Sequence, residues 1–220
     1  MIQPSIIKFL SALKKNNNKQ WFDDHRNQYE LIKKEFRLFV GQLINSIAVF
    51  DNSINFLEPK DCVFRINRDV RFSKDKRPYK NNLAAYFNKG GKKGGGAGYY
   101  IHIEPGKSYM AAGVWMPPSE ELSKIRQEID YNFDEWKKLL SEKSFKKYFN
   151  GTIDLKESLV RPPKGYTEEN PAIEYIKLKS FVATCSFTEE ETSSKDFIKI
   201  LSKRFQTLKP LVDFINRSLD

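Results

Sequence analysis

The middle of the chain alternates apolar and polar residues with a period of two, and this pattern limits the folds open to it. From Cys62 to Met116, Gly and Pro clusters separate four short runs rich in Val, Ile, Tyr, Phe and Ala, a pattern typical of β-strands. We place these strands at residues 62–67, 82–88, 98–104 and 109–115. The connections between them are short, whereas parallel neighbours need crossovers of about a dozen residues or more. The segment therefore predicts an antiparallel meander.

Amphipathic helices flank this segment on both sides. Apolar residues recur every three or four positions over residues 22–50 and again over residues 197–219, which is the helical period. Pro210 lies inside the second stretch and should kink or split that helix. The apolar run 181–187 predicts a fifth strand. We therefore expect one α+β domain spanning residues 1–220, with an antiparallel sheet of about five strands packed by N- and C-terminal helices.

Cysteine usage and hydropathy exclude several classes of protein. Cys62 and Cys185 lie in apolar runs without the Cys-x-x-Cys or His/Cys spacing of a metal site, so we expect reduced thiols, no metal and no cofactor. The N-terminal apolar cluster is interrupted by Lys8 and lacks the pattern of a signal peptide. No apolar run approaches the roughly eighteen residues that a membrane span needs. The sequence thus predicts a cytoplasmic protein that is not associated with a membrane.

Half of the formal net charge of +10 lies in one segment, residues 65–80, which reads RINRDVRFSKDKRPYK. Seven basic residues stand there beside two acidic ones, Asp69 and Asp75. Because two carboxylates cannot neutralise seven cations, an external anion or acids from elsewhere in the fold must contribute. The segment therefore predicts a site for an anionic partner.

The alternation of apolar and polar residues in this segment places Arg68 on an apolar strand face, where a charged side chain is unexpected. If the first strand continued through Phe72, Arg68 would share a face with apolar Ile66 and Val70. An unpaired guanidinium in an apolar layer is costly. Either a bulge near Asn67 turns the arginine outward, or it has a carboxylate or a bound anion as its partner.

The expected anion-binding residues are four cations and one tyrosine that would cap the site. They are Arg65, Arg68, Arg71, Lys76 and Tyr79. Pro78 excludes a regular inner strand over residues 73–80, so this half of the segment should form an ordered, exposed loop on which Tyr79 packs or stacks against a ligand ring. Asp69 would orient the arginines or act as a base, and the flanking arginines favour the orienting role because they depress its pKa.

Two other segments bear on function. Residues 89–98 hold six of the eleven glycines and three lysines, so we expect a mobile, positively charged loop; the P-loop pattern is absent because no Gly-Lys-Ser/Thr closes it. His102 shares a strand face with Tyr100 and Glu104, which makes it a candidate for a His–Glu proton-transfer pair. A structural histidine with a hydrogen-bonding partner is the other interpretation.

The central motif resembles that of a known family. The pattern R-x-x-R-D-x-R-F followed by D-K-x-x-Y comprises Arg65, Arg68, Asp69, Arg71, Phe72, Asp75, Lys76 and Tyr79. Together with N-N-N-K-Q-W-F near Trp21, residues 98–106 and residues 113–118, it is similar to a widespread bacterial family known as domain of unknown function number 2461. The resemblance implies a cytoplasmic bacterial protein of about this length, with no established activity, substrate or cofactor.

Three functions are therefore open. The first is an arginine-rich cleft for a phosphate- or carboxylate-bearing small molecule, in a protein that could be an enzyme. The second is nucleic-acid binding through the basic motif and interleaved aromatics, which are Phe64, Phe72, Tyr79, Tyr86, Tyr99 and Tyr100. The third is a structural or interaction protein whose motif forms an internal ion-pair network with solvated lysines.

Overall fold

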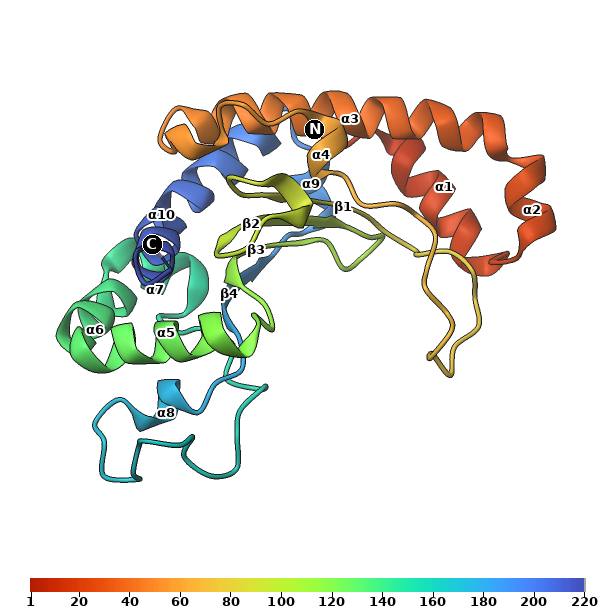
Figure 1. Cartoon of the computed structure of the whole chain (residues 1–220). Coiled ribbons are helices and arrows are strands. Elements are labelled where there is room, and N and C mark those ends of the chain that lie inside the picture. Colours follow the sequence, from red (N-terminus) through yellow and green to blue (C-terminus); the bar gives the residue numbers. More distant parts are fainter. Residues whose placement is uncertain (220) are drawn as a thin grey trace. The chain divides into compact units, whose positions relative to one another are not determined.

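The computed structural model describes residues 1–219. Over these residues it contains ten α-helices, two short 3-10 helices and one four-stranded antiparallel sheet (Figure 1). The α+β class predicted from the sequence is therefore confirmed, with four strands where about five were expected.

The sheet follows the chain in simple order. Its strands are β1 (Leu83–Phe87), β2 (Gly98–Ile103), β3 (Tyr109–Val114) and β4 (Phe181–Ser186). They pair in the order β1-β2-β3-β4, so the first three form the expected meander and β4 adds to its end. Gly113 permits this addition, because a Cβ atom at its position would lie only 1.9 Å from the carbonyl oxygen of Phe181.

The run 62–67, expected as the first strand, is not a strand. Cys62 is the last residue of helix α4 (Pro59–Cys62). Beyond it the chain makes two isolated antiparallel bridges, from Val63 to Ala85 and from Asn67 to Tyr79. The second bridge joins the chain to itself twelve residues further on, which folds residues 65–80 into a closed loop instead of extending the sheet.

Helices precede and follow the sheet. Those before it are α1 (Pro4–Lys15), α2 (Lys19–Asp24), α3 (Arg26–Ala48), η1 (Asn52–Ile54) and α4. Between β3 and β4 the chain forms α5 (Ser119–Tyr131), α6 (Phe133–Ser141), α7 (Lys143–Phe149) and α8 (Ile173–Ile176), and after β4 it forms α9 (Glu189–Ser193) and α10 (Phe197–Arg217). The predicted helix over 22–50 is broken at His25, which separates α2 from α3, whereas α10 is not split at Pro210.

The glycine-rich loop is anchored at both ends. η2 (Gly91–Lys93) lies beside α4, where the Lys92 ammonium donates to the carbonyl of Lys60 at 2.7 Å. Ala97 exchanges two hydrogen bonds with the Asn216 amide, at 2.8 and 3.2 Å. The loop expected to be mobile is thus held by hydrogen bonds on either side of its central glycines.

The chain forms two compact units. The first comprises residues 1–93, 100–110 and 186–203, and the second comprises residues 94–99, 111–185 and those from Arg204 onward. In the core of the first, Phe39 of α3 stacks on Phe197 of α10 with ring centroids 6.0 Å apart. In the core of the second, Trp136 packs at 5.2 Å from Phe214, with Tyr175 and Phe181 beside it.

The expectation of a single domain stays a prediction. Along residues 1–219 no helix combines the length and apolar character needed to span a membrane.

Candidate functional site

Residues 65–80, called the motif loop below, form a loop closed at its base by backbone hydrogen bonds. The Arg68 amide donates to the carbonyl of Pro78 at 2.9 Å, and the Lys80 amide donates to that of Ile66 at 2.8 Å. With the Asn67–Tyr79 bridge, these bonds hold the two halves of the loop together. In Figure 1 the motif loop is the yellow-orange segment that connects α4 to β1 along the chain and extends away from them as a hairpin.

Arg68 has a carboxylate partner inside the loop. Its Nη1 lies 2.8 Å from Oδ2 of Asp75 and donates to the Arg77 carbonyl at 2.9 Å. Arg77 donates to the same carboxylate, with Nη2 at 2.6 Å from Oδ2. Hydrogen bonds from Arg77, and then the charge of Arg68, hold the pKa of Asp75 well below its usual range. One aspartate thus binds an arginine from each half of the loop. Of the alternatives considered for Arg68, a bulge or an anionic partner, the structure shows a carboxylate partner.

The second motif acid is also paired. Asp69 accepts two hydrogen bonds from the Arg71 guanidinium, at 3.0 Å from Nε and 2.7 Å from Nη2, in the bidentate arrangement that suits a planar guanidinium. These bonds lower the pKa of Asp69. Lys76 donates its ammonium to the carbonyl of Val70 at 3.0 Å. Both motif acids are therefore ionised at neutral pH and hold arginines; the role expected for Asp69 at a ligand site stays a prediction.

Tyr79 faces the N-terminal helices. It is buried, and its ring stacks on Phe22 of α2 with centroids 4.0 Å apart and an interplanar angle of 15°. The Asn17 side chain accepts from its amide at 3.0 Å and donates to its carbonyl at 2.9 Å. The five residues expected to bind an anion therefore do not converge: Arg68, Arg71 and Lys76 bond within the loop, Tyr79 anchors its base, and Arg65 is exposed.

Two cations at the base of the loop have no acidic partner, and we call Arg65 and Lys80 the cationic pair. Neither forms an ion pair with any residue in the described chain, 1–219. The Lys80 ammonium is half-buried and lies 5.3 Å from the centroid of the Phe64 ring. Burial lowers the pKa of Lys80, and the charge of Arg65 lowers it further. The pair is thus a partly desolvated concentration of positive charge.

A polar cluster lies on the neighbouring strands. His102 of β2 has its Nδ1 3.0 Å from the Tyr100 hydroxyl and 3.3 Å from the Asn82 amide nitrogen. Its Nε2 lies 3.2 Å from Oε2 of Glu104, and its ring stacks on Tyr109 of β3 at 4.7 Å. These five residues are called the His102 cluster. The predicted sharing of one strand face by Tyr100, His102 and Glu104 agrees with these contacts.

The hydrogen bonds determine the tautomer of His102. An amide nitrogen such as that of Asn82 can only donate, so Nδ1 must be an acceptor. The ring proton is therefore on Nε2, which donates it to Glu104. The result is a chain of hydroxyl, imidazole and carboxylate groups in hydrogen-bonding order.

The imidazole and the two phenols of the His102 cluster are uncharged at neutral pH. Only 13% of the His102 side chain is exposed, and burial lowers its pKa although Glu104 acts in the opposite direction. The charge of Lys80 lowers the pKa of His102 as well, so this lysine acts electrostatically on the cluster. Burial raises the pKa of both Tyr100 and Tyr109. At neutral pH the imidazole is therefore neutral and both phenols keep their protons.

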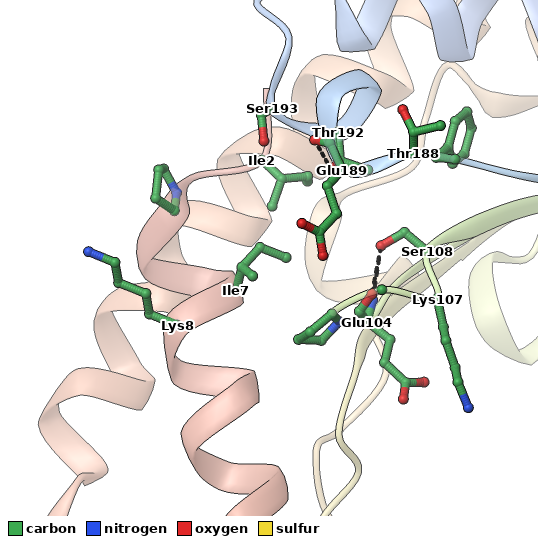
Figure 2. Close-up of a pocket in the computed structure, with 14 residues that line it drawn as sticks. Ile2, Ile7, Lys8, Glu104, Lys107, Ser108, Thr188, Glu189, Thr192 and Ser193 are labelled. Atoms are coloured by element: carbon green, nitrogen blue, oxygen red, sulfur yellow. Dashed lines mark hydrogen bonds between the residues drawn. The ribbon is translucent and has the colours of Figure 1, made fainter.

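A cavity of about 210 Å³ lies against the turn that follows β2. Its walls come from the start of α1, the turn 104–108 and the segment 187–193 (Figure 2). Ser108 fixes this turn by bonding both backbone groups of Glu104, at 3.0 and 3.2 Å. In Figure 2 the side chain of Glu104 points away from the cavity. Of the polar residues that line the cavity, Ser108 bonds the Glu104 backbone and the Thr192 hydroxyl donates to the carbonyl of Glu189.

Sequence reasoning missed Lys80 as a site residue. Its position in the basic segment was visible, but six other cations lie there, and nothing local distinguishes the cations that pair with an acid from those that do not. The signal that could have found it is the closing bridge, since pairing Asn67 with Tyr79 places Lys80 opposite Ile66 and beside Arg65.

Comparisons with known proteins identify the chain only by family. No curated protein and no solved structure matches it. A family model described as "Conserved hypothetical protein (DUF2461)" matches residues 5–214, nearly the whole chain. The chain therefore belongs to the DUF2461 family of conserved hypothetical proteins.

Proposed function

We propose that this protein binds a small molecule carrying a phosphate or carboxylate group, and that the cationic pair holds this group beside the His102 cluster. The observation that carries the proposal is the state of Lys80, whose half-buried ammonium has no carboxylate partner among residues 1–219. A desolvated charge without a counter-ion is unfavourable. A bound anion would remove that penalty.

The rest of the motif supports this assignment by elimination. Asp69 and Asp75 are engaged by Arg71 and by the clamp on Arg68 and Arg77. The carboxylates of the motif therefore cannot also neutralise Lys80. In this arrangement Arg68 stabilises the loop, and the residues proposed to contact the anion are Arg65 and Lys80 at the base of the loop.

The experiment is a thermal-shift titration with sodium phosphate and sodium sulfate against sodium chloride at matched ionic strength. We expect both divalent anions to raise the Tm of the native protein and to have little effect on the Lys80→Met and Arg65→Gln variants. Lys76→Met is the matched control, because that lysine is exposed and bonds only a backbone carbonyl. An equal response in the Lys76 and Lys80 variants would contradict the proposal.

A second candidate, binding of single-stranded nucleic acid, is favoured by one specific observation. Phe72 is 95% exposed near the tip of the motif loop, with the Arg71 guanidinium 5.8 Å from its ring centroid. Lys74 and Lys76 beside it are also exposed. An exposed ring among cations is the arrangement on which bases stack while phosphates are neutralised.

Fluorescence anisotropy with a labelled oligonucleotide tests this candidate. Binding should weaken as salt rises, with a slope of about 0.7 per phosphate contacted on a logarithmic plot. Phe72→Ala should weaken it further, whereas Phe56→Ala should not, because Phe56 is equally exposed but lies outside the motif loop. A flat salt dependence contradicts the nucleic-acid interpretation.

We also propose, from the family resemblance, a cytoplasmic location in a bacterium. Fractionation of cells expressing the tagged protein tests the location, and recovery from the membrane or periplasmic fraction would contradict it.

A further inference from the structure

We propose that Tyr100, His102 and Glu104 form a proton relay that acts on the molecule bound at the cationic pair, which makes the protein a general-base enzyme. This inference rests on the proposed anion site. The substrate class is a phosphate- or carboxylate-bearing molecule with a transferable proton, on a hydroxyl or an activated carbon, near its anionic group. Tyr100 is the catalytic residue that touches the substrate.

The order of the hydrogen bonds carries the argument. The Tyr100 hydroxyl lies 3.0 Å from Nδ1 of His102, and Nε2 of the same ring lies 3.2 Å from Glu104. A hydroxyl beside an imidazole that a carboxylate orients is the general arrangement by which proteins activate an O–H group. The Asn82 amide approaches the same Nδ1 atom at 3.3 Å, and the Tyr109 ring stacks on the face of the imidazole.

The proton balance of the step is simple. The substrate gives its proton to the Tyr100 oxygen while the tyrosine proton moves to Nδ1 of His102. The imidazole then carries protons on both nitrogens, and Glu104 stabilises its positive charge through Nε2. The substrate is left with an added negative charge beside Lys80. No electron leaves or enters the site, and reversal of the same transfers returns the proton to the product.

The charges around His102 suit it to this role. Several titratable or charged groups face it from the elements packed around it, namely Tyr100 of β2, Glu104 just after β2, Tyr109 of β3, Lys80 before β1, and Lys14 of α1, which lies 3.9 Å from Glu104. The neutral ring has a lone pair on Nδ1 and can accept a proton there. A bound anion would offset the charge of Lys80 and so favour protonation of His102.

Coupling between anion binding and His102 protonation is therefore the test. The chain has two histidines, so ¹⁵N-histidine NMR of a His25→Gln background reports His102 alone. We expect the Nε2–H tautomer at neutral pH. Saturating sulfate, which does not titrate in this range, should raise the pKa of His102 by about one unit relative to chloride. Calorimetry in two buffers of different ionisation enthalpy should show matching proton uptake.

The variants separate the relay from the binding site. Lys80→Met should raise the pKa of His102 in chloride and abolish the sulfate response. Glu104→Gln should lower that pKa but preserve sulfate binding. Tyr100→Phe should preserve binding, folding and the Nε2–H tautomer, because the Asn82 amide still donates to Nδ1.

Each negative result has a distinct meaning. Sulfate binding at Lys80 without proton uptake overturns the relay and leaves the anion site intact. An Nδ1–H tautomer in the native protein overturns the relay whether or not sulfate binds. The absence of any sulfate-dependent change, in the thermal titration as well as in the spectra, overturns the proposed function and the relay together.

Discussion

At the scale of single residues, the acids of the motif loop determine which of its arginines form ion pairs. Asp75 accepts from Arg77 and pairs with Arg68, residues on opposite halves of the loop. Asp69 pairs with Arg71 only two positions away. The first pairing links the two halves of the loop and the second does not, although both involve an aspartate and a guanidinium.

We predict that Asp75→Asn loosens the motif loop. Without its carboxylate, Arg68 and Arg77 lose their common acceptor and repel each other. Limited trypsin digestion at neutral pH should cleave the variant within residues 68–77 several times faster than the native protein. Asp69→Asn is the matched control and should be cleaved at nearly the native rate; equal acceleration in both would show that the clamp does not order the loop.

The same clamp makes the loop sensitive to acid. The pKa of Asp75 is depressed in the folded protein from an ordinary value of 3.8. Its stabilising effect is therefore fully present above that value and disappears as pH falls through the lower folded pKa. Hydrogen exchange of the loop amides should accelerate below about pH 4 beyond the intrinsic trend, whereas between pH 5 and 8 this residue contributes no pH dependence.

At the scale of elements, the pairing of β3 with β4 depends on a glycine. Gly113 has a φ of 126°, and a Cβ there would lie 1.9 Å from the Phe181 carbonyl oxygen, which is backbone and cannot turn away. Gly106, in the turn after β2, also has a positive φ of 72°, but no atom lies within 4 Å of its added Cβ. Strain acts at both positions, and a steric clash at only one.

We predict that Gly113→Ala destabilises the protein far more than Gly106→Ala. The first change should cost about 3 kcal/mol or more, because it forces β3 and β4 apart. The second should cost about 1 kcal/mol, the strain of a side chain in the left-handed region. Urea denaturation measures both, and similar free energies of unfolding for the two variants would refute the close approach of the strands.

At the scale of the whole molecule, the two compact units are built from interleaved parts of the chain. β2 contributes Gly98 and Tyr99 to the second unit and residues 100–103 to the first. The chain passes repeatedly from one unit to the other. This interleaving differs from the usual arrangement of domains joined by one linker.

We predict that the protein unfolds in one cooperative transition. Trp21 lies in α2 of the first unit and Trp136 in α6 of the second. Each can be made the sole tryptophan by replacing the other two with phenylalanine. For each variant, the urea midpoint from tryptophan fluorescence should coincide with the midpoint that circular dichroism gives for the same variant. Two resolved transitions would show that the units are independent domains.

The sequence by itself determined the class of the fold and most of its elements, because apolar periodicity is a local property. It placed three strands of the meander, the strand at 181–187, the long helices, and Tyr100, His102 and Glu104 on one face. It failed at residues 62–67, where the alternation is that of a strand but Asn67 pairs with Tyr79 of the same loop.

Only the tertiary structure decided which cations of the motif are neutralised. Ion pairing depends on distances that folding sets between residues, and sequence spacing does not distinguish Arg68, which meets Asp75, from Lys80, which meets no acid among residues 1–219. It also turned Tyr79 toward Phe22 and placed Lys80 where its charge acts on His102. The sequence therefore located the charge of this protein, and the fold determined which of its cations are paired with acids.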